Sequence, residues 1–175
     1  WSLMQENNVV TIPCVTEEGV LEGVITIGDI TKSYMNLYDS SIISKANTKY
    51  SNILDTLEGS IVVGDADAYF DKGKVLIAAA NPDLMENYIE KHDLVILGNR
   101  YESQLCAIEM EAGCIIVCEG AGVSLTIRKL AQERGCTVIT TPYDTYTTAR
   151  LINQSMPISY FMTMENIIGF SDDDP

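Results

Sequence analysis

Apolar positions near the start of the chain fall into two short runs separated by polar residues. These runs, residues 11–15 and 20–27, predict a pair of strands joined by a turn at Gly19. Asp29 stands at the exit of the second run and opens a predicted helix. That helix is expected to reach the polar stretch at 44–50, which predicts a linker.

A regular alternation of apolar runs and amphipathic segments fills the middle of the chain. Five apolar runs predict strands, at residues 60–64, 75–80, 94–98, 114–120 and 137–142. Helical patterns follow most of them, at residues 81–90, 100–113, 123–135 and 144–154. Strand and helix alternating at this spacing indicate right-handed crossovers and a mainly parallel sheet. The apolar runs barely alternate, as expected for strands covered on both faces. The fold class is therefore α/β.

Two acidic stretches interrupt this pattern. Residues 65–74 predict a solvated hairpin turn between the first two of the five strands. The tail, residues 155–175, predicts a short helical turn, then a strand, then an acidic turn. A strand so late in the chain, together with an unusual first residue, Trp1, leads us to expect a segment of a longer protein.

Net charge narrows the choice of partners. The 175 residues carry a net charge of −14, which disfavours nucleic acid and anionic membrane surfaces as partners. The longest uncharged run, 151–164, is too short to span a bilayer. Five cysteines, mostly in apolar runs, fit buried thiols in a reducing cytoplasmic compartment. With His92 as the single histidine, we expect no metal site and no catalytic centre in this segment.

The opening residues carry a specific resemblance. The stretch Ile12-Pro13-Cys14-Val15, the turn glycine Gly19 and the run from Gly23 to Asp29 resemble the second half of a CBS motif. Met162 and Thr163 resemble the opening of another CBS motif. Between them, the run of residues 98–152 resembles a DRTGG domain, with Gly98-Asn99-Arg100 near the place of the eponymous run. These resemblances imply partial CBS motifs (β-β-α) at 1–50 and 155–175, flanking a DRTGG-type α/β domain at 51–154.

The order CBS, DRTGG, CBS is similar to the regulatory region of family II, manganese-dependent inorganic pyrophosphatases. The resemblance implies control by adenine nucleotides, with AMP and ADP inhibiting and ATP or diadenosine polyphosphates activating. It also implies a homodimer, a catalytic domain elsewhere in the parent chain, and manganese bound there rather than in this segment.

The same resemblance implies a nucleotide site. Its expected residues are Val10, Thr11, Ile12, Thr26, Gly28, Asp29, Met162 and Thr163. A carboxylate can accept hydrogen bonds from both hydroxyls of a ribose, and Asp29 is placed for that role. Thr26 could direct its hydroxyl at a phosphate, and the helix start adds a positive dipole end. An aspartate beside a helix start is also a common cap, so both roles for Asp29 stay open.

The sequence leaves two alternative functions open, and two further motifs have a structural interpretation. The segment could be a structural dimerisation module without ligand, or a small α/β enzyme with its site at the strand ends. The enzyme reading lacks a recognisable nucleophile and base. Gly120-Ala121-Gly122 before a helix favours a turn over a phosphate loop, because no lysine follows at the required spacing. Arg100, after a strand, favours a solvated side chain over an anion ligand.

Overall fold

The computed structural model describes residues 1–35 and 39–162, which form parts of two compact units. Unit 1 comprises Trp1–Tyr38 and Ile158–Pro175, and unit 2 comprises Asp39–Pro157. The division falls at Asp39, so residues 39–50 belong with the larger unit, although the sequence pattern groups them with the first CBS motif.

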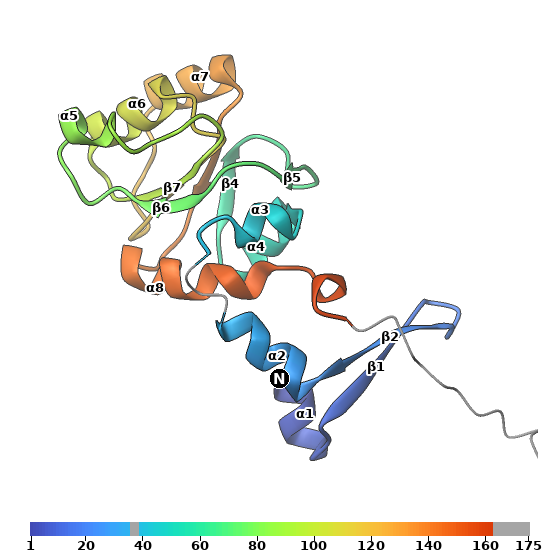
Figure 1. Ribbon diagram of the computed structural model, residues 1–175. Helices are drawn as coiled ribbons and strands as arrows, with labels where there is room; N and C mark the ends of the chain where they lie inside the picture. The colour runs from blue at the N-terminus through green and yellow to red at the C-terminus, as the bar shows by residue number, and fades with distance from the viewer. Residues whose placement is uncertain (36–38, 163–175) are drawn as a thin grey trace, which may run out of the picture. The chain divides into compact units, whose positions relative to one another are not determined.

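Unit 1 is built on an antiparallel hairpin with a helix on either side in the chain (Figure 1). Its described elements are α1 (Ser2–Asn7), β1 (Thr11–Val15), β2 (Leu21–Thr26), α2 (Ile27–Met35) and the 3-10 helix η3 (Ile158–Tyr160). The turn is fixed by Thr16, whose hydroxyl accepts hydrogen bonds from the amides of Glu18 and Val20 at 3.2 and 3.3 Å. Gly19 completes the turn with a φ of 82°, a left-handed conformation that glycine adopts without strain.

Unit 2 contains a five-stranded sheet in the order β4-β9-β8-β7-β6. Its elements are α3 (Ile42–Lys45), β3 (Thr48–Lys49), α4 (Tyr50–Thr56), β4 (Ser60–Val63), β5 (Tyr69–Phe70), β6 (Val75–Ile77), α5 (Pro82–Met85), β7 (Leu94–Leu97), α6 (Tyr101–Glu109), β8 (Cys114–Val117), α7 (Leu125–Arg134), β9 (Thr137–Thr140), α8 (Thr145–Leu151) and η2 (Ile152–Ser155). Strands β6 to β9 are parallel, and β4 pairs antiparallel with β9. The predicted α/β class with a mainly parallel sheet is therefore confirmed.

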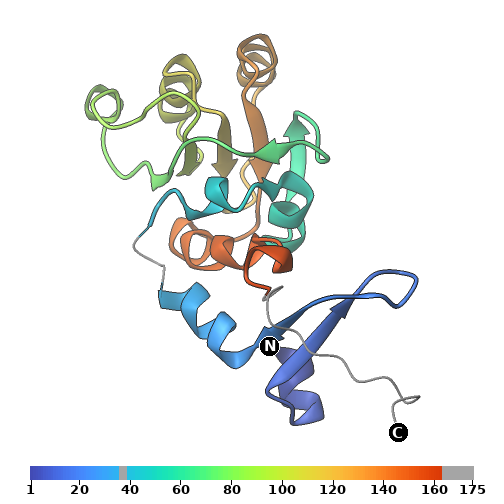
Figure 2. The ribbon, with the colours of Figure 1, turned by 45° about the vertical axis from the view of Figure 1, so that its right-hand side comes forward.

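Helices cover both faces of this sheet (Figure 2). Helices α5, α6 and α7, which connect the parallel strands in sequence, lie together on one face, as same-handed crossovers between neighbouring strands require. Helices α4 and α8 lie on the other face. Strands β7 and β8 are buried at every position, which explains why their apolar runs do not alternate.

Two local predictions were wrong. The acidic stretch at 65–74 does not join a hairpin, because β4 and β6 lie at opposite edges of the sheet. It contains β5 instead, which pairs with β3. The predicted linker at 44–50 is also structured, since Thr48 is fully buried and its hydroxyl donates to the carbonyl of Ile43 at 2.8 Å.

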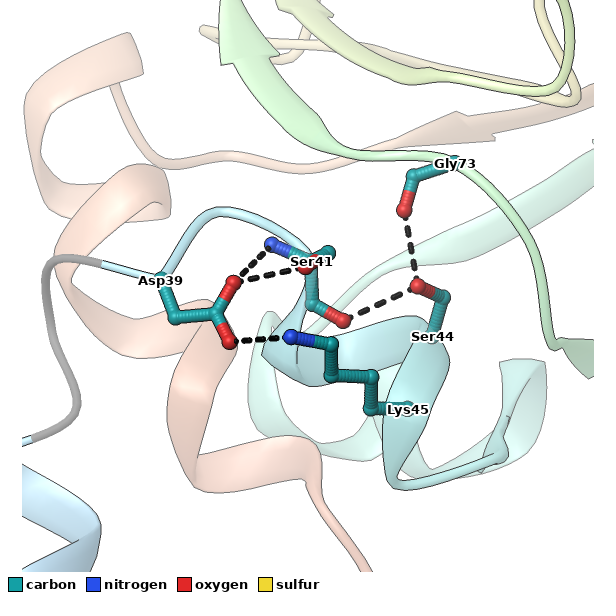
Figure 3. Close-up of polar contacts among 5 residues, drawn as sticks. All are labelled: Asp39, Ser41, Ser44, Lys45 and Gly73. Atoms are coloured by element: carbon teal, nitrogen blue, oxygen red, sulfur yellow. Dashed lines mark hydrogen bonds and ion pairs between the residues drawn. The ribbon is translucent and has the colours of Figure 1, made fainter.

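Unit 2 begins with a compact polar network around Asp39 (Figure 3). Oδ1 of Asp39 accepts hydrogen bonds from the amide and the hydroxyl of Ser41 at 3.0 and 2.6 Å, and Oδ2 accepts from Nζ of Lys45 at 2.7 Å. The hydroxyl of Ser44 lies 2.7 Å from the carbonyl oxygen of Gly73 and 2.9 Å from that of Ser41. The network therefore ties the first turn of unit 2 to the loop that leads into β6.

The loop that leads into β6 packs closely against the start of β7. Gly73 has a φ of 92°, and a β-carbon there would collide with the carbonyl oxygen of His92. The neighbouring Asp93 is fully buried, and its carboxylate accepts hydrogen bonds from the amides of Lys74 and Glu90, both at 2.8 Å. The buried carboxylate thus satisfies two loop amides that would otherwise lack partners.

Candidate functional site

The hairpin register brings most of the predicted nucleotide residues together. Thr11 stands directly opposite Thr26, and Ile12 stands opposite Ile25. One step beyond the strand pair, the amide of Ile27 donates to the carbonyl oxygen of Val10 at 3.1 Å. The residue that precedes β1 is therefore fastened to the first residue of α2.

Thr26 and Asp29 form a reciprocal cap at the start of α2. Oδ2 of Asp29 accepts hydrogen bonds from the amide and the hydroxyl of Thr26, at 2.8 and 2.7 Å. In return, the amide of Asp29 donates to the hydroxyl oxygen of Thr26 at 3.2 Å. This is a capping box with threonine at the cap and a carboxylate three residues later.

The capping box corrects the predicted helix. Helix α2 starts at Ile27 rather than at Asp29, because the Thr26 side chain caps it. It extends to Met35, and a separate helix, α3, begins at Ile42. The single helix expected from Asp29 to about residue 44 is therefore wrong.

The carboxylate of Asp29 is poised as an anionic acceptor. The hydrogen bond from the Thr26 side chain, followed by the one from its amide, lowers the pKa of Asp29, and the positive charge of Lys32 adds to this effect. Both hydrogen bonds from Thr26 end on Oδ2, and Oδ1 has no partner among the described residues. A carboxylate oxygen offers about two lone pairs, so Oδ1 is free to accept hydroxyl donors such as those of a ribose.

The Thr26 hydroxyl is less available than the sequence suggests. Its one proton is directed at Oδ2 of Asp29, and its oxygen accepts from the amide of Asp29. A phosphate needs a hydrogen-bond donor, so in this arrangement the hydroxyl serves the carboxylate rather than an anion.

The remaining predicted residues differ in how far they are exposed to solvent. The side chain of Val10 is exposed, that of Ile12 is partly buried, and Gly28 is exposed on the first turn of α2. The backbone amide of Gly28 has no hydrogen-bond partner within the described ranges. Met162 follows η3 and donates its amide to the carbonyl of Ile158 at 3.1 Å. Thr163 lies outside the described residues.

Lys32 is a residue that the sequence reasoning missed. It lies on α2 three residues beyond Asp29, is exposed to solvent, and lowers the pKa of that carboxyl through its charge. The signal was present in the sequence, because residues three apart on a helix are neighbours on its surface.

Unit 2 offers a groove but no reactive group within it. A hollow of about 440 Å³ lies beside β4, the end of α7 and the start of β9. It is lined by Val62, Val63, Gly64, Ala131, Gln132, Gly135, Cys136 and Thr137. The titratable group in this lining is Cys136, and burial raises the pKa of its thiol to about 12. This thiol is therefore protonated at neutral pH and a poor nucleophile.

The other singled-out motifs have ordinary structural roles. Gly120 adopts a left-handed turn with a φ of 63°, and α7 is capped by the hydroxyl of Ser124, which accepts from the amide of Ile127 at 3.3 Å. Arg100 is exposed just before α6. In the acidic stretch, Asp67 pairs with Lys49 at 3.0 Å.

The described part of the chain has neither a metal-binding cluster nor a membrane-spanning helix. Within residues 1–35 and 39–162, histidine, cysteine and acidic side chains form no group of three or more able to hold a metal ion. Over the same described residues, no helix is long and apolar enough to cross a membrane.

Comparison with known families settles what the larger unit is. The model of the DRTGG domain matches residues 52–155, which is more than half of the chain. The chain belongs to the DRTGG-domain family. This DRTGG domain coincides with the parallel sheet and its helices, so the predicted resemblance in the middle of the chain is confirmed.

Relatives of this DRTGG-domain chain include metal-dependent pyrophosphatases. It is 37% identical over 174 residues to the cobalt-dependent inorganic pyrophosphatase of Clostridium perfringens, covering 99% of this chain and 32% of that protein. It is 26% identical over 161 residues to a probable manganese-dependent inorganic pyrophosphatase of Thermotoga maritima, covering 92% of this chain and 29% of that protein. The chain thus spans about a third of the length of these curated relatives.

A solved structure extends the similarity to the whole chain. It is the crystal structure of the CBS and DRTGG domains of the regulatory region of Clostridium perfringens pyrophosphatase, complexed with the activator diadenosine tetraphosphate. The match has a TM-score of 0.91 at 37% identity and covers 100% of this chain and 76% of that one. The predicted resemblance to a CBS and DRTGG regulatory region is confirmed.

Proposed function

We propose that this chain is an adenine-nucleotide-binding regulatory region that controls an inorganic pyrophosphatase. The observation that carries the proposal is the open Oδ1 of Asp29, in a chain that matches a nucleotide-bound regulatory region over its whole length. By the family resemblance, AMP and ADP inhibit, while ATP or a diadenosine polyphosphate activates.

In the proposed complex, each part of the nucleotide meets a different group. The ribose diol donates to Oδ1 of Asp29, which Thr26 holds in place. The amide of Gly28 and the positive end of α2 face a phosphate. The adenine lies against residues 10–12 and Met162.

The nucleotide acts at a distance in this proposal. Binding favours one conformation of the CBS motifs, assigned to 1–50 and 155–175, which flank the DRTGG domain at 51–154 in the sequence. That bias reaches the catalytic domain as a coupling free energy, which is typically about 1–3 kcal/mol between two sites. We propose a cytoplasmic homodimer, with a catalytic domain in the same polypeptide and manganese bound there. Cobalt is the alternative metal, since one relative is named for it.

Calorimetric titration of the full-length protein and of this chain with AMP, ATP and diadenosine tetraphosphate tests the proposal. Saturable binding by both samples is the expected result. Folded protein that binds none of these nucleotides would contradict it and favour a dimerisation module. Pyrophosphate turnover by this chain alone would favour the enzyme alternative.

A further inference from the structure

The sequence of unit 1 contains many acidic residues and a single basic one. Its residues, 1–38 and 158–175, contain nine aspartate and glutamate side chains, no arginine and no histidine. Lys32 is the only basic side chain in this stretch of sequence. A polyanionic ligand that binds in unit 1 therefore has a single basic side chain of this unit available to neutralise it.

Lys32 is well placed to act as that exception. It lies on the nine-residue helix α2, three residues from Asp29, so the two side chains project from neighbouring positions on the helix surface. Its ammonium charge is felt at the Asp29 carboxyl, whose pKa it helps to lower. Lys32 is exposed and forms no ion pair with a carboxylate of the described residues. Its charge is thus available to a ligand held at Asp29.

The other positive groups near Asp29 are weaker. The hydroxyl proton of Thr26 is directed at the carboxylate of Asp29. The other group able to meet an anion is the amide of Gly28 at the start of α2. The helix dipole there is equivalent to about half an elementary charge. One phosphate can be met there, whereas a chain of phosphates needs a further cation.

We propose that Lys32 binds the phosphate chain of the nucleotide and sets the preference for longer chains. This inference rests on the proposed nucleotide site. A monophosphate leaves its charge near the Gly28 amide, while each additional phosphate extends the anion toward other groups on the α2 surface. The contribution of Lys32 therefore grows with the number of phosphates, and the residue discriminates polyphosphate activators from AMP.

The test uses the full-length protein with Lys32→Gln, Lys32→Arg and the control Lys91→Gln. Lys91 is also exposed, but it lies in unit 2, where it pairs with Glu111 at 2.9 Å. Dissociation constants for AMP and for diadenosine tetraphosphate are measured by calorimetry at low and high salt. Circular dichroism confirms that each variant is folded.

Lys32→Gln is expected to weaken diadenosine tetraphosphate binding by about tenfold and AMP binding by about threefold or less, as for loss of one partly solvated charge pair. The tetraphosphate affinity of Lys32→Gln should also fall less steeply with salt than that of the wild type. Lys32→Arg should retain the preference for the longer chain, and Lys91→Gln should match the wild type.

The possible outcomes distinguish the role of Lys32 from the proposed nucleotide site on which it rests. Wild-type binding of both nucleotides, with the same affinity ratio in Lys32→Gln, would overturn the role of Lys32 and leave the nucleotide site intact. A wild-type protein that binds neither nucleotide would overturn both.

Discussion

Thr26 holds Asp29 by donating both its amide and its hydroxyl to the same carboxylate oxygen, Oδ2, at 2.8 and 2.7 Å. The two residues thereby cap α2 and leave Oδ1 of Asp29 as an oriented anionic acceptor. One pair of side chains therefore fixes the helix start and presents the group to which we assign ribose recognition. The alternatives of helix cap and nucleotide ligand do not compete, because they use different oxygens.

Replacing Thr26 by alanine should destabilise unit 1. The substitution removes the hydroxyl that accepts from the Asp29 amide and donates to its carboxylate. Loss of such a cap costs about 1 kcal/mol of unfolding free energy. Amide hydrogen exchange in α2, compared with Thr26→Ser, measures the effect. Equal exchange in alanine and serine variants would show that the cap contributes nothing.

Asp39 should make the stability of the protein depend on pH in the acid range. The hydrogen bond from Lys45, followed by those from Ser41, lowers its pKa from the ordinary 3.8 to about 2. A lowered carboxyl pKa stabilises the folded state above the unfolded-state value, and this contribution disappears as the pH falls from about 4 to about 2. Thermal unfolding of the wild type and Asp39→Asn across that range isolates the contribution.

The two unfolding curves should diverge above about pH 4 and converge toward pH 2. Added salt should reduce the divergence, because both side chains of the pair are open to solvent, Lys45 at 58% and Asp39 at 39% exposure. Curves that stay parallel across the range would show that Asp39 titrates normally.

Gly73 should tolerate no side chain. A β-carbon would overlap the carbonyl oxygen of His92, and the φ of 92° disfavours any residue but glycine. Gly73→Ala should therefore lower the unfolding free energy by about 2 kcal/mol or more. Gly98→Ala is the matched control, since a β-carbon there meets no atom within 4 Å. Equal denaturant midpoints for the two variants would contradict this account of the loop.

Gly28 should separate ligand binding from folding. A β-carbon there would lie 3.4 Å from the hydroxyl of Thr26, an ordinary contact, so Gly28→Ala should fold normally. Alanine in a helix is favoured over glycine by roughly 0.5–1 kcal/mol, so stability should hold or rise. The added methyl group stands beside the amide assigned to phosphate, so AMP affinity should fall. Unchanged affinity by calorimetry would remove Gly28 from the site.

Much of the larger unit could be predicted because its strands are buried on both faces. The runs at residues 94–97, 114–117 and 137–140 are almost continuously apolar, and a helix separates each from the next. The partner of β4 was not predictable in the same way. Its place beside β9 depends on contacts between residues far apart in sequence, such as the bond from the Thr141 hydroxyl to the Leu57 carbonyl at 2.6 Å.

The candidate site, too, could be predicted from the sequence only in part. The three-residue spacing of Thr26 and Asp29 is typical of a capping box, in which the helix starts after the threonine and not at the aspartate. The direction of the Thr26 proton was beyond a sequence argument, because a hydroxyl rotates toward whichever acceptor lies nearest. Because the Thr26 proton is directed at Asp29, we assign phosphate binding to Lys32 and not to Thr26.

The most direct test of the central claim is the AMP dissociation constant of the full-length Asp29→Ala variant, measured by calorimetry. Asp39→Ala is the control, since it removes a similarly half-buried, hydrogen-bonded carboxylate from unit 2. The account predicts that Asp29→Ala weakens AMP binding by about tenfold or more, as loss of a charge-assisted hydrogen bond implies, while Asp39→Ala binds like the wild type. Undiminished AMP affinity in a folded Asp29→Ala protein would contradict it.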